Sequence, residues 1–139
     1  MRTKLITGLS AGATLALLLA ACATTAPAPS RGKVLYEDFC AACHGPGGKG
    51  DGVLAGEWKR PPADLTGIAA RNGGTFPLAK VLSQIDGYTR STDSHSAMPE
   101  MGPVFQDSPT VLVDTGDGIE TPVPGALLAL ADYLRDLQD

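Results

Sequence analysis

Three stretches of the chain carry apolar residues at the spacing of one helical face, and each predicts a helix. The first spans 32–40, the second 77–87 and the third 127–138. The second opens with a proline and ends at a glycine, which are both typical helix boundaries. A shorter helix is expected over 64–71, ended by an Asn-Gly-Gly sequence. The third stretch has the longest apolar face: Leu127, Leu130, Ala131, Leu134 and Leu137.

The segments between these helices are rich in glycine and proline, which predicts loops. Residues 45–52 hold five glycines, but they lack the spacing and the following Ser or Thr of a phosphate-binding loop. Residues 103–124 are expected to form an irregular excursion, with a brief strand over 110–113 and a tight turn over 114–118. The acidic residues of that turn do not match the spacing of an EF-hand, so calcium binding is not predicted.

The N-terminal region predicts export and a lipid anchor. Residues 1–21 begin with positive charge and run without charge from Leu5, as a secretory signal peptide does. The run is long enough to be weighed as a membrane-spanning helix, which needs ~20 apolar residues. Its end, Leu-Ala-Ala-Cys22, instead resembles the lipobox of bacterial lipoproteins. Cleavage there would make Cys22 a lipidated N-terminus, with 22–31 as a flexible linker to one domain over 32–139.

Composition and charge narrow the class of protein. The 139 residues are 43% hydrophobic and 5% aromatic, which suits one domain with a small core. Leaving out Arg2 and Lys4 of the predicted signal peptide reduces the 11 basic residues to 9, against 15 acidic ones, a formal charge of −6. This balance argues against a nucleic-acid partner and favours protein partners with a basic or apolar face.

The strongest chemical signal is Cys40-Ala-Ala-Cys43-His44, at the end of the first predicted helix. Cys-x-x-Cys-His is the attachment signature of haem c, because two thiols can add to the vinyl groups of one porphyrin while the imidazole binds the iron. A zinc site would need four ligands, and His95 is the only other histidine. A thioredoxin-like pair would need a βαβ context, and a structural disulfide is the third alternative. The prediction is one covalent haem c held by Cys40, Cys43 and His44.

Around this motif the sequence resembles the class I cytochrome c family. Residues 32–45 (Gly-x-x-x-Tyr-x-x-x-Cys-Ala-Ala-Cys-His-Gly) are similar to the opening of that family, and residues 130–134 (Leu-Ala-Asp-Tyr-Leu) to its closing helix. Residues 71–87 extend the similarity to bacterial monohaem members. The resemblance implies a small all-α fold whose N- and C-terminal helices cross around one covalently bound haem, with Tyr36 facing Tyr133.

The resemblance also implies supporting roles for residues near the haem. The small residue at Gly32 would let the C-terminal helix cross closely. A backbone carbonyl near Pro61 or Pro62 would accept the Nδ1 hydrogen of His44, which orients the ring and strengthens it as a ligand. Residues 58–60 (Trp-Lys-Arg) could bind the haem propionates, with a solvated basic pair beside a core tryptophan as the alternative.

The sixth ligand of the iron is predicted at Met98. A methionine followed by a proline, in the loop after the third helix, is where the family places its distal thioether. Met101 and His95 are the alternatives in the same stretch, and each would otherwise be a surface residue. The apolar face of the 77–87 helix is expected to pack on the haem, and the 103–124 excursion to pass over its lower edge.

The predicted function is transfer of single electrons between redox protein partners, with no enzymatic activity and no small-molecule substrate. The anchor at Cys22 predicts the periplasmic face of a bacterial membrane. Ala23 lies where inner-membrane lipoproteins carry a retention aspartate, which favours the outer membrane. The alternative function is a haem enzyme or sensor with an open or labile sixth position, which would reduce peroxide or bind a gas with His95 as the distal acid-base.

Overall fold

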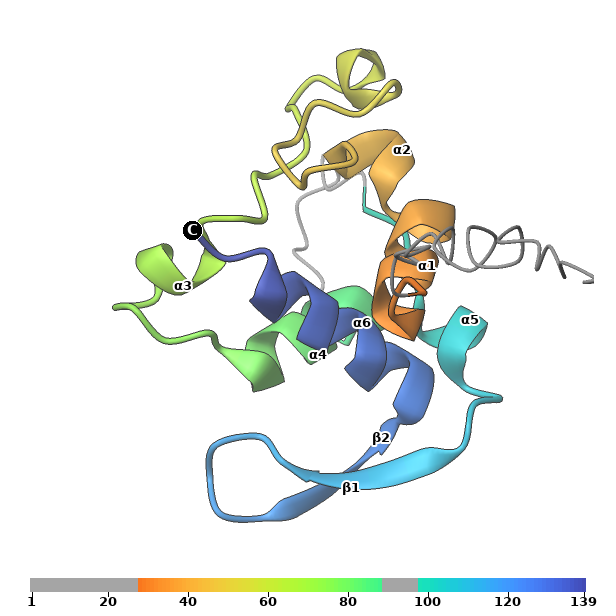
Figure 1. Ribbon diagram of the computed structural model, residues 1–139, viewed down its shortest axis with the longest axis vertical. Coiled ribbons are helices and arrows are strands. Elements are labelled where there is room, and N and C mark those ends of the chain that lie inside the picture. The colour runs from red at the N-terminus through yellow and green to blue at the C-terminus, as the bar shows by residue number, and fades with distance from the viewer. Residues whose placement is uncertain (1–27, 89–97) are drawn as a thin grey trace, which may run out of the picture.

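The computed structural model describes residues 28–88 and 98–139. None of the helices in this part of the chain is both long and apolar enough to cross a membrane. The elements, labelled in Figure 1, are α1 (Arg31–Phe39), α2 (Ala41–His44), η1 (Ala55–Glu57), α3 (Ile68–Arg71), α4 (Leu78–Asp86), α5 (Gly102–Phe105), β1 (Thr110–Asp114), β2 (Glu120–Pro124) and α6 (Gly125–Asp136).

The first and last helices cross in the middle of the molecule (Figure 1). A Cβ on Gly32 would overlap the carbonyl oxygen of Ala129, so the backbones of α1 and α6 touch at this point. The rings of Tyr36 and Tyr133 lie beside the crossing, with 5.3 Å between their centroids and 51° between their planes. The crossing and the tyrosine pair that the resemblance implied are therefore confirmed.

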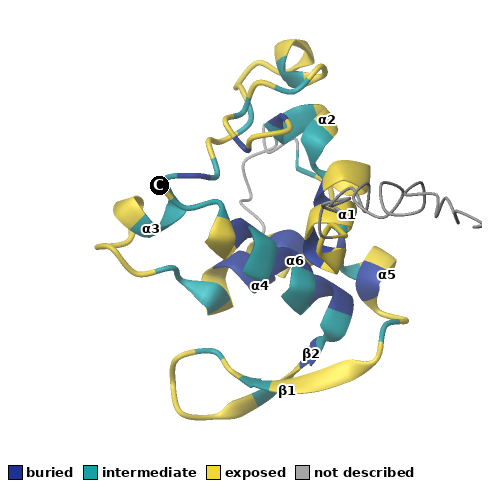
Figure 2. Ribbon diagram, viewed as in Figure 1, coloured by how far each residue is buried: buried dark blue, intermediate teal, exposed yellow. Residues whose placement is uncertain are grey.

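An apolar core lies where α1, α4, α5 and α6 meet, and Figure 2 shows that the buried residues gather there. The predicted helix after Pro77 is confirmed as α4. It ends at Gly87, whose φ of 100° is a left-handed conformation that glycine adopts without strain. The core side chains are Tyr36, Val81, Leu82, Ile85, Met101, Phe105, Val123, Ala126, Leu127, Leu130, Ala131 and Leu134.

The helix expected over 64–71 is shorter than predicted. Asp64 Oδ1 accepts hydrogen bonds from the backbone N–H of Thr66, at 2.9 Å, and from its hydroxyl, at 2.8 Å. Such a local side-chain turn competes with helical hydrogen bonding. Helix α3 therefore starts only at Ile68, and Asn72 ends it by donating from its side chain to the Ile68 carbonyl at 2.8 Å.

The expected excursion over 103–124 begins with the short helix α5 and continues as a β-hairpin over 110–124. Its first strand, β1, confirms the strand predicted over 110–113, and the hairpin means that the all-α prediction holds only in part. Strand β1 pairs antiparallel with β2, with Leu112 opposite Pro122. Asp114 Oδ1 accepts from the N–H groups of Gly116 and Gly118, and thereby builds the turn. One face of the hairpin packs against α6 through the buried side chain of Val123. Most of the other hairpin residues are exposed (Figure 2).

Candidate functional site

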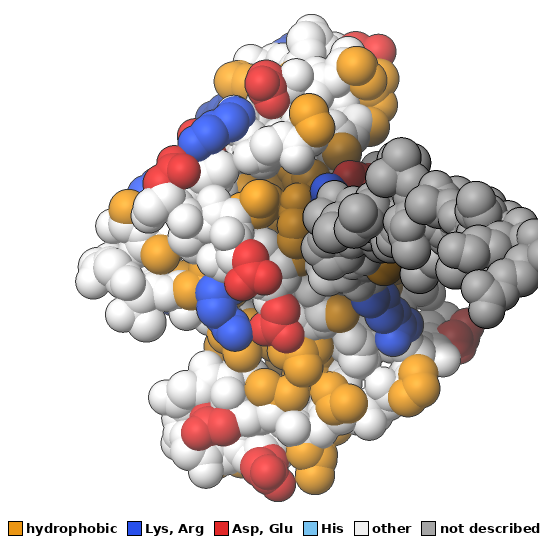
Figure 3. All heavy atoms as spheres, viewed as in Figure 1, with side chains coloured by type: hydrophobic (Ala, Val, Ile, Leu, Met, Phe, Trp, Pro, Cys, Tyr) orange, Lys and Arg blue, Asp and Glu red, His pale blue; other side chains and the backbone are white. Residues whose placement is uncertain are grey.

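A cavity of about 620 Å3 opens beside the crossing of α1 and α6, within the size range of cofactor sites. It is bounded by the end of α1 and α2, the 58–65 segment, α3, α4 and residues 98–101. Hydrophobic side chains gather in the hollow in the middle of the face shown in Figure 3. The apolar lining includes Phe39, Leu65, Ile68, Val81, Ile85 and Leu134, so the α4 face does border the cavity as expected.

The two cysteines of the motif lie in one helical turn at the cavity wall. The N–H of Cys40 donates to Tyr36 O at 2.9 Å, and its carbonyl accepts from the N–H of Cys43 and of His44. Both thiols are free, partly buried and in the lining. Burial, and next the nearby Cys43, raise the pKa of the Cys40 thiol to about 11. The thioredoxin-like alternative needs a βαβ context, and the sheet in the described residues is a two-stranded antiparallel hairpin, so that context is not found there.

His44 follows directly and is held by a hydrogen bond on the outer side of its ring. Its Nδ1 lies 2.9 Å from the carbonyl oxygen of Ala63. Because a carbonyl only accepts, Nδ1 carries the hydrogen, and the lone pair of the ring is then on Nε2. This is the tautomer that a metal-binding imidazole needs, with its partner already in place.

The acceptor for His44 is one or two residues beyond the predicted Pro61 or Pro62. The carbonyl of Pro62 packs against Gly50, where a Cβ would overlap its oxygen. The Pro62 carbonyl therefore contacts the loop that follows the motif, and the carbonyl of the next residue, Ala63, is the one that accepts from His44. The loop itself is fixed to the histidine, because the N–H of Gly50 donates to His44 O at 2.8 Å.

Two methionines line the same cavity as Cys40, Cys43 and His44. Met98 is partly buried and packs at the edge of the core, whereas Met101 is 8% exposed and belongs to the core itself. The N–H of Met101 donates to Ile85 O at 3.0 Å, which ties this stretch to the end of α4. The other alternative, His95, lies outside the described residues, as does Cys22.

The charged lining is entirely basic in the part of the chain that the structure describes. Arg60, Arg71 and Lys80 border the cavity, and no carboxylate does. Trp58 is also in the lining, whereas Lys59 is not. A haem needs an apolar pocket for its porphyrin and cations for its propionates, so these residues fit the group that the motif predicts.

Other expectations find no support around this cavity. The hairpin contributes no residue to the lining, so the excursion over the lower edge of the haem is not seen. Within residues 28–88 and 98–139, no three His, Cys, Asp or Glu side chains lie together where they could hold a metal ion. The zinc alternative therefore has no ligand set in these residues.

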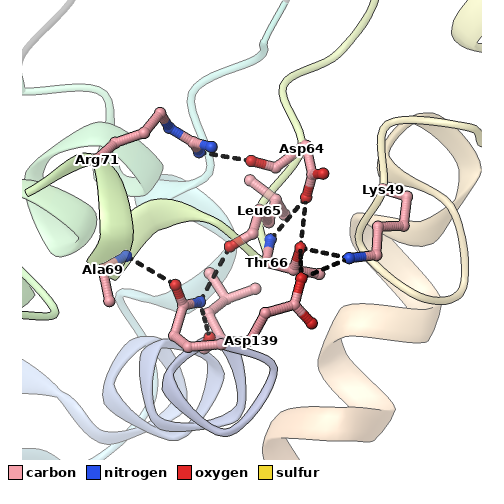
Figure 4. A network of polar contacts seen from close by, with 9 residues as sticks. Lys49, Asp64, Leu65, Thr66, Ala69, Arg71 and Asp139 are labelled. Carbon is pink, nitrogen blue, oxygen red and sulfur yellow. Dashed lines mark hydrogen bonds and ion pairs between the residues drawn. The ribbon is translucent and has the colours of Figure 1, made fainter. Parts of the chain in front are cut away.

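One group of residues behind the cavity was missed by the sequence analysis. Lys49, Asp64, Thr66 and Asp139 form a polar network next to Ala63 (Figure 4). The Asp-x-Thr spacing at 64–66 is a local signal for a side-chain turn. Nothing in the sequence places Asp139, which is 73 residues away, beside it.

Comparison with known proteins gives one family. Residues 29–114, which are more than half of the chain, match the family model described as Cytochrome c. Comparisons with curated proteins and with solved structures gave no significant match. The matched range contains the Cys-x-x-Cys-His motif and ends at β1, so the crossing by α6 is a separate structural observation. The chain belongs to the cytochrome c family, whose members bind haem c covalently and act as electron carriers.

Proposed function

We propose that this chain carries single electrons through one haem c, attached at Cys40 and Cys43 and ligated by His44 and Met98. The observation that carries the proposal is that these four side chains line one largely apolar cavity, in which His44 Nδ1 is already bonded to the Ala63 carbonyl. The bound haem supplies the one-electron Fe(III)/Fe(II) couple.

The residues of the chain control the environment of that couple. The bond to Ala63 keeps the hydrogen of His44 on Nδ1 and orients the ring. The apolar lining excludes water, which lowers the reorganisation that accompanies each change of charge. Arg60 and Lys80 are placed to bind carboxylates at the rim of the cavity. None of these features requires a site for a small-molecule substrate.

Burial favours Met98 over Met101 as the sixth ligand. Met101 is packed in the core at 8% exposure, and its backbone is tied to Ile85. Met98 also lines the cavity but is only partly buried. Pro99 follows it, and the fixed φ of proline stiffens the backbone that presents the sulfur.

The proposed location is the periplasmic face of a bacterial membrane, with a lipid anchor at Cys22 and the outer membrane favoured. Support comes from the lipobox-like Leu-Ala-Ala-Cys22 and from Ala23 after it. Redox proteins with basic or apolar faces fit the acidic balance of the chain. Cys22→Ser should convert a membrane-bound protein to a soluble or uncleaved one, and a soluble wild type that starts at another residue would contradict the anchor.

Cysteine substitutions test the attachment of the haem. The double variant Cys40→Ala/Cys43→Ala should accumulate no stable holoprotein, whereas Cys22→Ser is a matched control that should keep a normal haem spectrum. The purified wild type should retain its colour when extracted with acidified acetone. Transfer of the haem to the organic layer would contradict covalent attachment.

A further inference from the structure

The His44–Ala63 bond is one of three ties that join two neighbouring segments, 44–49 and 63–66. The second is the N–H of Leu65 donating to Gly48 O at 2.6 Å. The third is the ammonium of Lys49 donating to the hydroxyl of Thr66, also at 2.6 Å. The three hydrogen bonds follow one another along both segments. The position of the Ala63 carbonyl therefore depends on how firmly Thr66, at the other end of the 63–66 segment, is held against the 44–49 loop.

The far end is held by a network centred on the hydroxyl of Thr66, a residue that is only 5% exposed (Figure 4). Besides Lys49, this oxygen lies 2.8 Å from Asp64 Oδ1 and 2.9 Å from Asp139 Oδ2. Lys49 Nζ also donates to Asp139 Oδ2 at 2.8 Å. A hydroxyl has one hydrogen, so it donates to one carboxylate at a time while it accepts from Lys49. We name Lys49, Asp64, Thr66 and Asp139 the Thr66 clamp.

The end of the chain is itself fixed to the same region, which keeps Asp139 in reach. The side chain of Gln138 donates to Leu65 O at 2.9 Å and accepts from the N–H of Ala69 at 2.8 Å. The N–H of Asp139 donates to Thr66 O at 3.2 Å. The residues that follow α6 thus hold the 65–69 segment and, through Asp139, also contact Lys49 of the 44–49 loop.

We propose that the Thr66 clamp positions the iron ligand: by holding the 63–66 segment against the 44–49 loop, it keeps the Ala63 carbonyl on His44 Nδ1 and so sets how strongly the imidazole donates to the haem iron. This inference rests on the proposed function, because it requires that His44 binds the iron. Lys49, Thr66 and Asp139 do not line the haem cavity, and the partner of His44 Nδ1 is the Ala63 carbonyl, so their effect on the ligand would pass through the backbone of residues 63–66.

The expected direction of the effect follows from the chemistry of the ligand. A firm bond from Nδ1 to a carbonyl makes the imidazole a stronger donor, which stabilises Fe(III) relative to Fe(II) and lowers the reduction potential. A loosened clamp should therefore raise the potential. Removing the Lys49 charge would by itself favour Fe(III) and lower the potential. Thr66 variants are the cleaner test, since they change no formal charge.

The test uses the haem-loaded full chain and three variants. Thr66→Val removes the hydroxyl and keeps the shape, and Thr66→Ser keeps the hydroxyl. Val123→Ala is a control that destabilises the buried face of the hairpin, away from the cavity lining. Two quantities are measured for each: the reduction potential, and the solvent-exchange rate of the His44 Nδ1 hydrogen in the reduced, diamagnetic protein by proton NMR.

If the Thr66 clamp acts as proposed, Thr66→Val should have a raised reduction potential and about fivefold faster exchange of the His44 Nδ1 hydrogen. A change in rate of about fivefold is what the loss of one hydrogen bond is expected to produce. Thr66→Ser should remain near the wild type, and Val123→Ala should change neither quantity although it melts lower. If Thr66→Val accumulates no holoprotein, faster exchange in Asp139→Asn is the supporting result and an unchanged rate is the opposing one.

Two results would overturn the clamp while leaving the proposed function intact. One is wild-type potential and exchange in Thr66→Val, and the other is an equal shift in Val123→Ala, which would indicate general loosening. By contrast, a wild-type spectrum without a histidine-ligated haem would overturn the proposed function itself.

Discussion

Replacing Gly32 with alanine should destabilise the protein even though alanine is the better helix former. In an open helical site the change would gain up to about 1 kcal/mol. Here the new Cβ would overlap the backbone carbonyl of Ala129 and crowd Cβ of Tyr133, at 2.8 Å. Backbone cannot rotate away as a side chain can, so α1 and α6 would have to separate. Overpacking of this kind costs about 1–3 kcal/mol, and overlap with backbone places Gly32→Ala at the upper end of that range. Subtracting the helix-propensity gain of about 1 kcal/mol leaves an expected net loss of about 2 kcal/mol.

Thermal melting of the holoprotein by far-UV circular dichroism measures this loss. For a domain of this size, 2 kcal/mol corresponds to a fall in Tm of roughly 10 °C. Gly56→Ala is the matched control, because a Cβ at Gly56 meets nothing within 4 Å, and it should stay within about 0.5 kcal/mol of the wild type. A Gly32→Ala protein that melts at or above the wild-type temperature would refute the close crossing.

Three further predictions concern the site and its surroundings. Met98→Ala should abolish the near-infrared charge-transfer band of the ferric protein and lower its reduction potential by part of the ~0.8 V span that axial ligands cover. Loss of the band in Met101→Ala, and not in Met98→Ala, would show that Met101 is the sixth ligand. Tyr36→Phe removes a buried 2.6 Å hydrogen bond to a loop carbonyl and should cost about 1–3 kcal/mol in urea unfolding, while Tyr88→Phe, at an exposed position, should cost nothing measurable. Hydrogen bonds from Lys49 and Thr66 hold the pKa of Asp139 below its ordinary 3.8, so the ionised carboxylate stabilises the folded protein and Asp139→Asn should melt below the wild type at neutral pH. The difference in Tm should shrink as the pH falls from about 4 through the lowered pKa. A difference in Tm that is constant down to about pH 2 would contradict the ion pair.

The helices could be predicted because short-range patterns determine them, whereas their crossing was implied by the resemblance to class I cytochromes c. The apolar face of α6, the Pro77 and Gly87 boundaries of α4 and the glycine at 32 each act within a few residues or through one close contact. The first strand and the turn of the hairpin were predicted, but β2 was not, and its Pro122 and Pro124 argue against a strand. Residues two apart in a strand face the same edge, so the missing N–H groups of both prolines lie on one edge of β2. In a two-stranded sheet one edge of each strand has no partner strand, so β2 can still pair with β1.

The site was predictable in its covalent motif and less so in its supporting contacts. Cys40, Cys43 and His44 are adjacent in sequence, so one turn of helix brings them to the cavity. The acceptor at Ala63 depends on how Gly50 packs on the preceding carbonyl, a detail of tertiary packing. The hydrogen bond between Asp139 and Thr66 joins residues that are 73 positions apart, so no local sequence pattern predicts it.

The most direct test of the account is the optical spectrum of the purified full chain, recorded oxidised and then reduced. A covalent haem between His44 and Met98 predicts one haem per chain, a low-spin spectrum in both states, and the near-infrared thioether band in the oxidised protein. A high-spin spectrum in either state would show an open sixth position and would favour a haem enzyme or sensor. A protein without visible absorption, after expression with a functional haem-attachment system, would contradict the account entirely.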